Sequence, residues 1–193
     1  MRIEKVLTFH GYGSSPSRIK WLIEAFEELE IDVTAPKLPQ PLVKAYEYVK
    51  TLGLDADAFS GHSMGGALSL ILAAQRSKPA IAVAPPTDLS FQLEYMRRTP
   101  SLKKIYDEIA SLVKIEEMVR LSPMNFRYEK PVLIIHGTDD KVVPIEQSIQ
   151  FCKKIPKCKL VEINGMSHTP RKEEEITILK KSIREFVEFL KES

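Results

Sequence analysis

Short apolar runs alternate along the chain with longer stretches in which apolar residues recur at helical spacing. The apolar runs predict β-strands at residues 5–9, 32–35, 58–60, 80–84, 132–136 and 160–163. The helical patterns fall at residues 17–28, 42–51, 64–76, 145–154 and 173–191. Several strand runs are apolar throughout, as in strands buried on both faces. The alternation therefore predicts an α/β fold, with a mostly parallel sheet of about six strands and helices on both faces.

One segment breaks this alternation. Between Pro86 and Pro131 the sequence shows no strand pattern and two helical patterns, at residues 101–113 and 115–120. Its apolar residues are too numerous for a solvated loop: Leu93, Tyr95, Met96, Ile105, Tyr106, Ile109 and Leu112. These side chains either line a pocket or pack the segment onto the sheet, and the two interpretations are compatible.

Composition narrows the class of protein. The 193 residues are 44% hydrophobic and 28% charged, as in an ordinary globular chain, and we expect one domain over residues 1–193. The net charge of +2, without a basic stripe interleaved with aromatics, argues against a nucleic-acid partner. No apolar run reaches the roughly 18 residues of a membrane span. Residues 1–5 lack the apolar core of a signal peptide, so we predict a cytoplasmic protein. Cys152 and Cys158 are then expected to be free thiols, because cytosolic thiols stay reduced, and a disulfide between them is the alternative.

A serine motif carries the clearest chemistry. Residues 61–65 read G-H-S-M-G, between a predicted strand and a predicted helix. This is the setting of a nucleophile elbow, in which Ser63 occupies a strained turn and neighbouring glycines leave room for it. The backbone N–H of Met64, the residue after the serine, is then one expected oxyanion donor. The alternative is a glycine-rich turn that holds an incidental serine.

Each of the four histidines also lies in a short motif. His10 opens H-G-Y-G-S-S after the first predicted strand, and His62 belongs to the serine motif. His136 opens H-G-T-D-D-K-V-V-P, and His168 follows the last predicted strand in G-M-S-H-T-P. The chain order of serine, aspartate and histidine is that of α/β-hydrolases. Because each histidine belongs to a separate motif and no cysteine or carboxylate cluster joins them, we expect no metal site.

Nearly the whole chain resembles a compact α/β-hydrolase. The elbow at residues 61–66 is similar to that of carboxylesterases and monoacylglycerol-lipase-like enzymes. Residues 122–126 and 131–144 resemble dienelactone hydrolases and the catalytic domain of prolyl-oligopeptidase-type peptidases. The resemblance implies an α/β-hydrolase fold without the first two strands of the full family fold. It also implies a short helical lid, here the insertion at residues 88–128.

The resemblance assigns roles to three side chains. Ser63 would be the nucleophile and His168 its base, on a loop brought over the carboxyl edge of the sheet. In the family pattern H-G-x-x-D-x-x-V-P, the fifth position is the acid that orients the histidine, which is Asp140 here. Asp139, which is adjacent, and Asp88, which follows the fourth predicted strand, remain alternatives for the acid.

The surroundings of these residues follow from the same resemblance. The family pattern points to the backbone N–H of Tyr12 as the second oxyanion donor, whereas His10 and His136 are expected to be structural. The expected pocket consists of Tyr12, Pro86, Leu93, Met96, Tyr106 and Ile109.

The expected activity is hydrolysis of a small-molecule carboxylic ester, or of a thioester, through an acyl-enzyme and without a cofactor. A dienelactone-hydrolase-like or small aminopeptidase-like enzyme is an alternative, which the Ser122-Pro123 stretch supports. A catalytically silent binding protein on the same scaffold is a further alternative. The intact set of Ser63, Asp140 and His168 argues against it.

Overall fold

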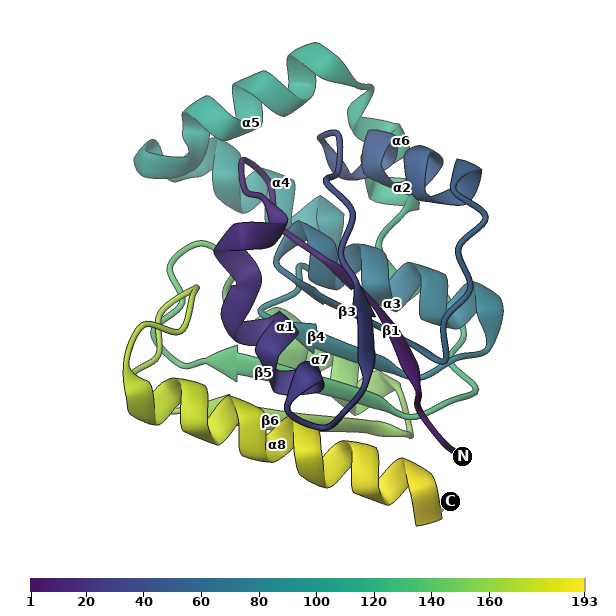
Figure 1. Cartoon of the computed structure of the whole chain (residues 1–193). Coiled ribbons are helices and arrows are strands. Elements are labelled where there is room, and N and C mark those ends of the chain that lie inside the picture. Colours follow the sequence, from purple (N-terminus) through teal and green to yellow (C-terminus); the bar gives the residue numbers. More distant parts are fainter. Residues whose placement is uncertain (193) are drawn as a thin grey trace.

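A single parallel sheet organises the computed structural model, which describes residues 1–192 (Figure 1). Within these residues its six strands are β1 (Lys5–Phe9), β2 (Asp32–Thr34), β3 (Ala58–His62), β4 (Ala80–Val83), β5 (Val132–Gly137) and β6 (Cys158–Ile163). They lie side by side in the order β2-β1-β3-β4-β5-β6, and every neighbouring pair is parallel. The predicted α/β fold class is confirmed.

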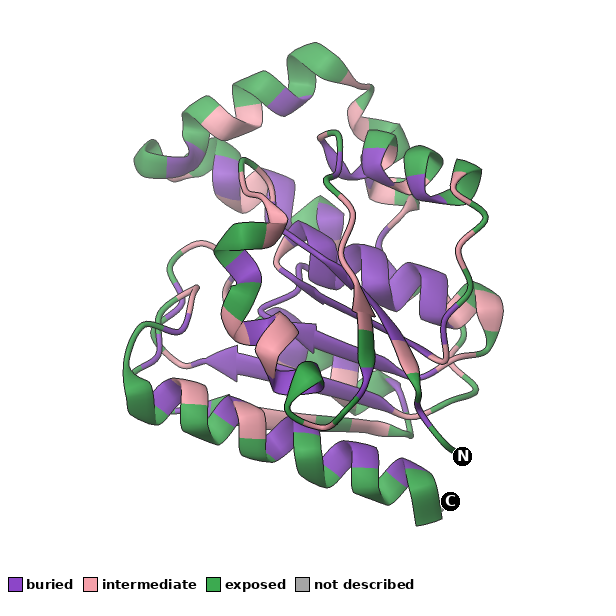
Figure 2. Cartoon of the chain, viewed as in Figure 1, coloured by how far each residue is buried: buried purple, intermediate pink, exposed green. Residues whose placement is uncertain are grey.

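The inner strands are buried on both faces, as their unbroken apolar runs predicted (Figure 2). Helices α1 (Lys20–Glu27) and α8 (Glu173–Glu192) cover one face, where Leu22, Phe26 and Ile183 pack against the sheet. Helices α2 (Leu42–Thr51), α3 (Met64–Arg76) and α7 (Glu146–Lys154) lie on the other face. The central helix α3 is buried at every position from residue 64 to residue 73.

Several element boundaries differ from the prediction, by one to three residues. Strand β3 continues to His62, two residues beyond the predicted end, because its pairing with β4 extends to Val83. Helix α1 begins at Lys20 and not at residue 17, because a 3₁₀ turn, η1 (Pro16–Ile19), precedes it. None of the helices within residues 1–192 has the length and apolar character needed to cross a bilayer.

The segment between β4 and β5 contains helices and no strand, and it holds one helix that the sequence did not predict. It consists of α4 (Leu89–Arg98), α5 (Pro100–Leu112), α6 (Ile115–Arg120) and a 3₁₀ turn, η2 (Pro123–Asn125). Helix α4 was missed, although Asp88 is a typical N-cap whose carboxylate accepts a hydrogen bond from Phe91 N at 3.1 Å. Helix α5 lies farthest from the sheet, at the top of Figure 1.

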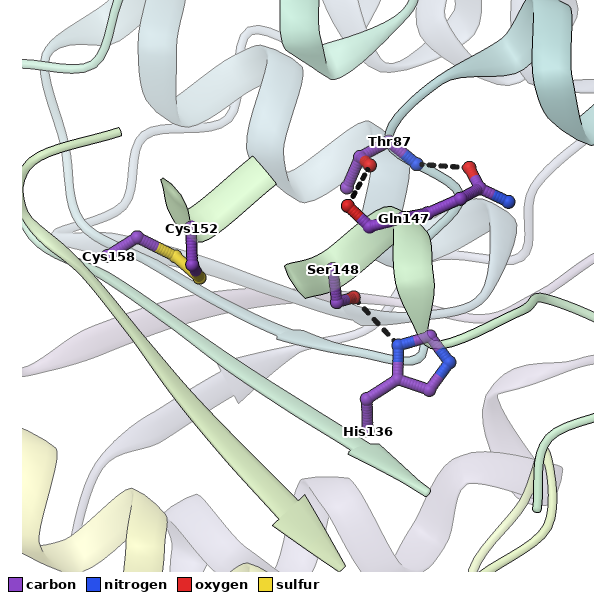
Figure 3. The surroundings of a disulfide bond; sticks show 6 residues. All are labelled: Thr87, His136, Gln147, Ser148, Cys152 and Cys158. Atoms are coloured by element: carbon purple, nitrogen blue, oxygen red, sulfur yellow. Dashed lines mark hydrogen bonds between the residues drawn. A yellow bond between two sulfur atoms is a disulfide. The ribbon is translucent and has the colours of Figure 1, made fainter. Parts of the chain in front are cut away.

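The expectation of free thiols is wrong, because Cys152 and Cys158 form a disulfide (Figure 3). Helix α7 ends at Lys154 and β6 begins at Cys158, so a short turn brings the two residues back together. Their Cα atoms are 4.9 Å apart, within the range that a disulfide spans. The bond joins the end of α7 to the start of β6.

Candidate active site

Ser63 lies in a strained turn between β3 and α3. Its φ of 56° is in the left-handed region that non-glycine residues rarely adopt. The turn is fixed by a hydrogen bond from Ser63 N to Val83 O at 2.9 Å. A Cβ atom at Gly61 would overlap the backbone of Gly65, and one at Gly65 would overlap the backbone of Phe9. The two glycines of the motif are therefore required by the close approach of β1, β3 and α3.

Ser63, His168 and Asp140 form a hydrogen-bonded chain at the carboxyl edge of the sheet. The Oγ of Ser63 is 2.9 Å from Nε2 of His168, and Nδ1 of His168 is 2.7 Å from Oδ2 of Asp140. Because a carboxylate only accepts, Nδ1 carries the proton and Nε2 is left to accept from the serine hydroxyl. The other two candidate acids lie apart from this chain: Asp139 is exposed and Asp88 caps α4.

The Asp140 carboxylate accepts four hydrogen bonds. Val142 N and Val143 N donate to Oδ1 at 2.8 Å and 2.9 Å. Nε2 of His136 donates to Oδ2 at 3.1 Å, beside the bond from His168. Burial alone would raise the pKa of Asp140, but the bonds from His136 and His168 outweigh it and hold this pKa below its usual range. Asp140 is therefore a charged, fixed acceptor near neutral pH.

His136 was expected to be a structural residue at a strand end, yet it touches the predicted acid directly. Its Nδ1 is 2.7 Å from Oγ of Ser148, and its Nε2 is also 2.9 Å from Val143 O. The sequence held a signal for this contact, since His136, near the end of β5, and Asp140 belong to the same motif H-G-T-D-D-K-V-V-P. His10 forms a separate network: its Nε2 accepts from Leu38 N at 2.9 Å, and its Nδ1 donates to Gly11 O at 2.8 Å.

His62 holds the backbone of His168. Its Nε2 is 2.8 Å from His168 O, and since a carbonyl oxygen only accepts, Nε2 carries the proton. The ring centroids of His62 and His168 lie 4.9 Å apart, and the ring of Trp21 packs edge-to-face with His62 at a centroid distance of 5.4 Å. Burial and then the neighbouring His168 lower the pKa of His62 to about 3. His62 is therefore neutral in the folded protein.

This neutral histidine makes folding stability depend on pH. In the unfolded chain His62 has the ordinary pKa of 6.5, so its contribution is complete above that pH and declines as the pH falls towards 3. At pH 4.5 we expect a loss of about 3 kcal/mol relative to neutral pH, at roughly 1.4 kcal/mol per pH unit. Urea unfolding of the wild type and of His62→Gln, at pH 4.5 and at neutral pH, measures this loss of unfolding free energy. Equal pH dependence in the two proteins would contradict the assignment.

A cavity of about 170 Å³ opens beside Ser63 and His168. Five of the six predicted pocket residues line it: Tyr12, Pro86, Leu93, Met96 and Ile109. Tyr106 does not line this cavity, because Leu102, Ile105 and Ile109 form the lining face of α5, and Tyr106 is half-buried outside it. The sequence reasoning also missed the following lining residues: Pro41, Leu42, Leu89, Gln92, Leu102, Ile105, Met118, Val142 and Val143.

The two expected oxyanion donors border the same cavity. Met64, which lines the cavity, is the first residue of α3, so its N–H has no acceptor within the helix. Tyr12 also lines the cavity, and its hydroxyl donates to Oε2 of Glu108 on α5 at 3.0 Å. Within residues 1–192, no group of three or more histidine, cysteine, aspartate or glutamate side chains is placed to hold a metal ion.

Residues 42–190 match the prolyl oligopeptidase family, and this span includes Ser63, Asp140 and His168. The chain belongs to this family. Its α/β-hydrolase resemblance is thereby confirmed, and the general activity that follows is that of a hydrolase.

Several known proteins are similar to this member of the prolyl oligopeptidase family. A putative esterase/lipase 2 of Mycoplasma pneumoniae is 23% identical over 83% of this chain and 81% of its own. Among solved structures, mouse alpha/beta hydrolase domain-containing protein 10 has a TM-score of 0.78 at 18% identity, covering 96% of this chain and 90% of that one. Est1E of Butyrivibrio proteoclasticus has a TM-score of 0.68 at 24% identity, covering 96% and 87%. At these identities the two structures show the shared fold.

Proposed function

We propose that the protein is a serine hydrolase that cleaves carboxylic esters of small molecules. Ser63 is the nucleophile, His168 the general base and Asp140 the orienting acid. The observation that carries the proposal is the hydrogen-bonded chain from Ser63 through His168 to Asp140, with its serine end at an apolar cavity. A serine hydroxyl becomes an effective nucleophile only when an oriented base removes its proton, and His168, held by Asp140, is placed to act as that base.

The reaction follows from the protonation states of the chain. Oγ of Ser63 attacks the acyl carbon while Nε2 of His168 takes the hydroxyl proton, and the imidazolium then donates this proton to the departing alcohol oxygen. Water, deprotonated by His168 in turn, attacks the acyl-enzyme and releases the carboxylic acid. Asp140 keeps the Nδ1-protonated tautomer and stabilises the imidazolium.

The developing oxyanion needs two preorganised donors. We assign them to the backbone N–H groups of Met64 and Tyr12. The free N–H at the start of α3 supports the first, and the helix dipole adds to it. The position of Tyr12 at the cavity supports the second, and the hydrogen bond that Nδ1 of His10 donates to Gly11 O steadies that loop.

The cavity wall favours an ester over a peptide. Beyond Ser63 and His168, the polar lining side chains are Tyr12 and Gln92, so the described wall offers no charged group to bind a peptide terminus. An apolar wall suits an acyl chain, and an ester needs less help for its leaving group than an amide does. The Mycoplasma pneumoniae relative, named as a putative esterase/lipase, supports the same choice.

Direct labelling tests the proposal. A fluorophosphonate probe should attach to Ser63, as located by peptide mass spectrometry, and p-nitrophenyl esters from acetate to octanoate should be hydrolysed. Absence of both ester turnover and Ser63 labelling in folded protein would refute it. Hydrolysis of aminoacyl-anilides in preference to esters would favour the aminopeptidase alternative.

The proposed lid gives a prediction on chain length. Helices α4 and α5, within the insertion at residues 88–128, supply Leu93, Met96 and Ile109 to the wall. Met96→Ala should enlarge the acyl site and raise the octanoate-to-acetate ratio of kcat/KM, by about 10- to 200-fold at most. Acetate hydrolysis should change least, because its acyl group is too short to reach this wall.

The same helix offers a matched control for this measurement. Phe91, also on α4, is 46% exposed and stacks on Tyr95 outside the cavity lining. Phe91→Ala should therefore keep the wild-type ratio. An unchanged ratio in Met96→Ala, or an equal change in Phe91→Ala, would argue against α4 as the acyl wall.

A further inference from the structure

Two buried glutamines meet between the proposed lid and the body of the protein. Gln92 on α4 and Gln147 on α7 are each only 4% exposed. Nε2 of Gln147 donates to Oε1 of Gln92 at 2.6 Å. Burying two amides in an otherwise apolar region is unfavourable unless their polar atoms are paired. The remaining contacts of this pair show what it connects.

Gln147 binds the start of α4. Its Oε1 accepts hydrogen bonds from Thr87 N and Asp88 N, both at 3.1 Å. Its backbone oxygen accepts from Oγ1 of Thr87 at 2.9 Å, and both bonds to Thr87 are drawn in Figure 3. Since Oε1 is used by two N–H donors, the amide group of Gln147 has one orientation, with Nε2 directed to Gln92. Helix α7 thus fixes the first turn of α4.

Gln92 continues the chain towards the acid of the proposed triad. Its Nε2 donates to Val142 O at 2.9 Å, and Val142 N donates to Oδ1 of Asp140 at 2.8 Å. One residue therefore separates Gln92 from the carboxylate that orients His168. Gln92 also lines the cavity that we assign to the acyl group.

Helix α7 reaches the other oxygen of the same carboxylate through its next residue. Oγ of Ser148 is 2.7 Å from Nδ1 of His136, and Nε2 of His136 is 3.1 Å from Oδ2 of Asp140 (Figure 3 shows the first contact). Gln147 and Ser148 thus lead to Asp140 by two routes, one to each carboxylate oxygen. The hydrogen bonds of the Gln92–Gln147 pair therefore link the position of α4 to the position of Asp140.

We propose that Gln92 and Gln147 are positioning residues for the ester hydrolysis. They hold the loop at residues 140–143 against α4. The apolar wall of the acyl site and the Asp140 carboxylate therefore keep a fixed position relative to each other. The proposal rests on the proposed function, because the acid and the acyl wall are defined by it. A displacement of about 1 Å in catalytic geometry can cost about 100-fold in rate, so a pair that fixes this register has a measurable effect.

Two variants break the pair in different places. Gln92→Met keeps the length of the side chain and removes both of its hydrogen bonds. Gln147→Glu keeps an oxygen for the N–H groups of Thr87 and Asp88, and its ionised carboxylate presents an acceptor to Gln92 Oε1 in place of the donor. The matched control is Gln75→Met, because Gln75 on α3 hydrogen-bonds the Tyr46 hydroxyl in an exposed position.

Kinetics separate positioning from simple lining of the cavity. Both variants should lower kcat by about 10- to 100-fold, by the same factor on acetate and octanoate esters, with little change in KM. Gln75→Met should match the wild type. Wild-type kcat in Gln92→Met, or a loss confined to the longer ester or to KM, would overturn the proposal.

A second measurement needs no substrate. The proton on Nδ1 of His168, in its bond to Asp140, should give a far-downfield NMR resonance in the resting protein. Gln92→Met and Gln147→Glu should shift or broaden it, whereas Gln75→Met should not. An unchanged resonance in both pair variants would overturn the positioning role even if the wild type hydrolysed no ester. Failure of ester hydrolysis with a shifted resonance would instead refute the proposed function alone.

Discussion

Ser63→Ala is expected to lower ester hydrolysis by about 10⁴- to 10⁶-fold, the range seen when a triad serine is removed. Without Oγ there is no acyl-enzyme, and His168 can only assist direct attack by water. The fold should persist, because Ser63 Oγ has its hydrogen bond to His168 at the cavity, whereas the elbow is fixed by the bond from Ser63 N to Val83 O. The measurement is kcat/KM on p-nitrophenyl acetate beside the thermal unfolding midpoint.

Ser60→Ala is the matched control for this loss. Ser60 lies on β3, three positions before the nucleophile, and its hydroxyl is buried without a hydrogen-bond partner among residues 1–192. Its removal should leave activity close to that of the wild type. If Ser63→Ala kept more than a trace of activity, or a fluorophosphonate adduct formed on another residue, the nucleophile would have to be reassigned.

The parts of the site that sequence could predict are those encoded locally. The elbow requires a small residue two positions before and two positions after Ser63, because β1, β3 and α3 approach closely there. Gly61 and Gly65 therefore mark the elbow in the sequence. Parallel strands all end at one edge of the sheet. Loops after β3, β5 and β6 therefore bring Ser63, Asp140 and His168 to the same edge, although they are far apart in the chain.

The parts that sequence could not predict depend on tertiary packing. Ile105 and Tyr106 both fit the apolar face of α5, and only the rotation of this helix against α4 decides that Ile105 lines the cavity. The Gln92–Gln147 bond joins residues 55 positions apart and leaves no periodic signal. The disulfide was missed because free thiols were predicted from the expected cytoplasmic location. The turn between α7 and β6, which brings Cys152 and Cys158 together, was not considered.

Asp140→Asn is expected to lower kcat by about 10⁴-fold, the size of effect that this change has in a serine protease triad. The reason here is the supply of hydrogen-bond donors. Val142 N and Val143 N both point at Oδ1, so the single oxygen of an asparagine must take that position. Its amide nitrogen then faces His168 and His136. The N–H groups of these two rings both need an acceptor, and they now face a donor.

This conflict should reverse the tautomer of His168. With a donor opposite Nδ1, the ring places its proton on Nε2 and can no longer accept from the Ser63 hydroxyl. The result should be visible in the ¹⁵N chemical shifts of His168, beside the loss of kcat and of fluorophosphonate labelling. A retained Nδ1–H tautomer together with the full kinetic loss would contradict this explanation.

Asp139→Asn and Asp88→Asn test the alternatives for the acid. Asp139 is exposed, and an asparagine at position 88 can still cap α4, so both variants should remain within a few-fold of the wild type. Because Asp139 adjoins Asp140, its variant also controls for disturbance of the loop. A loss near 10⁴-fold in either variant, with Asp140→Asn within about tenfold of the wild type, would move the acid to that residue.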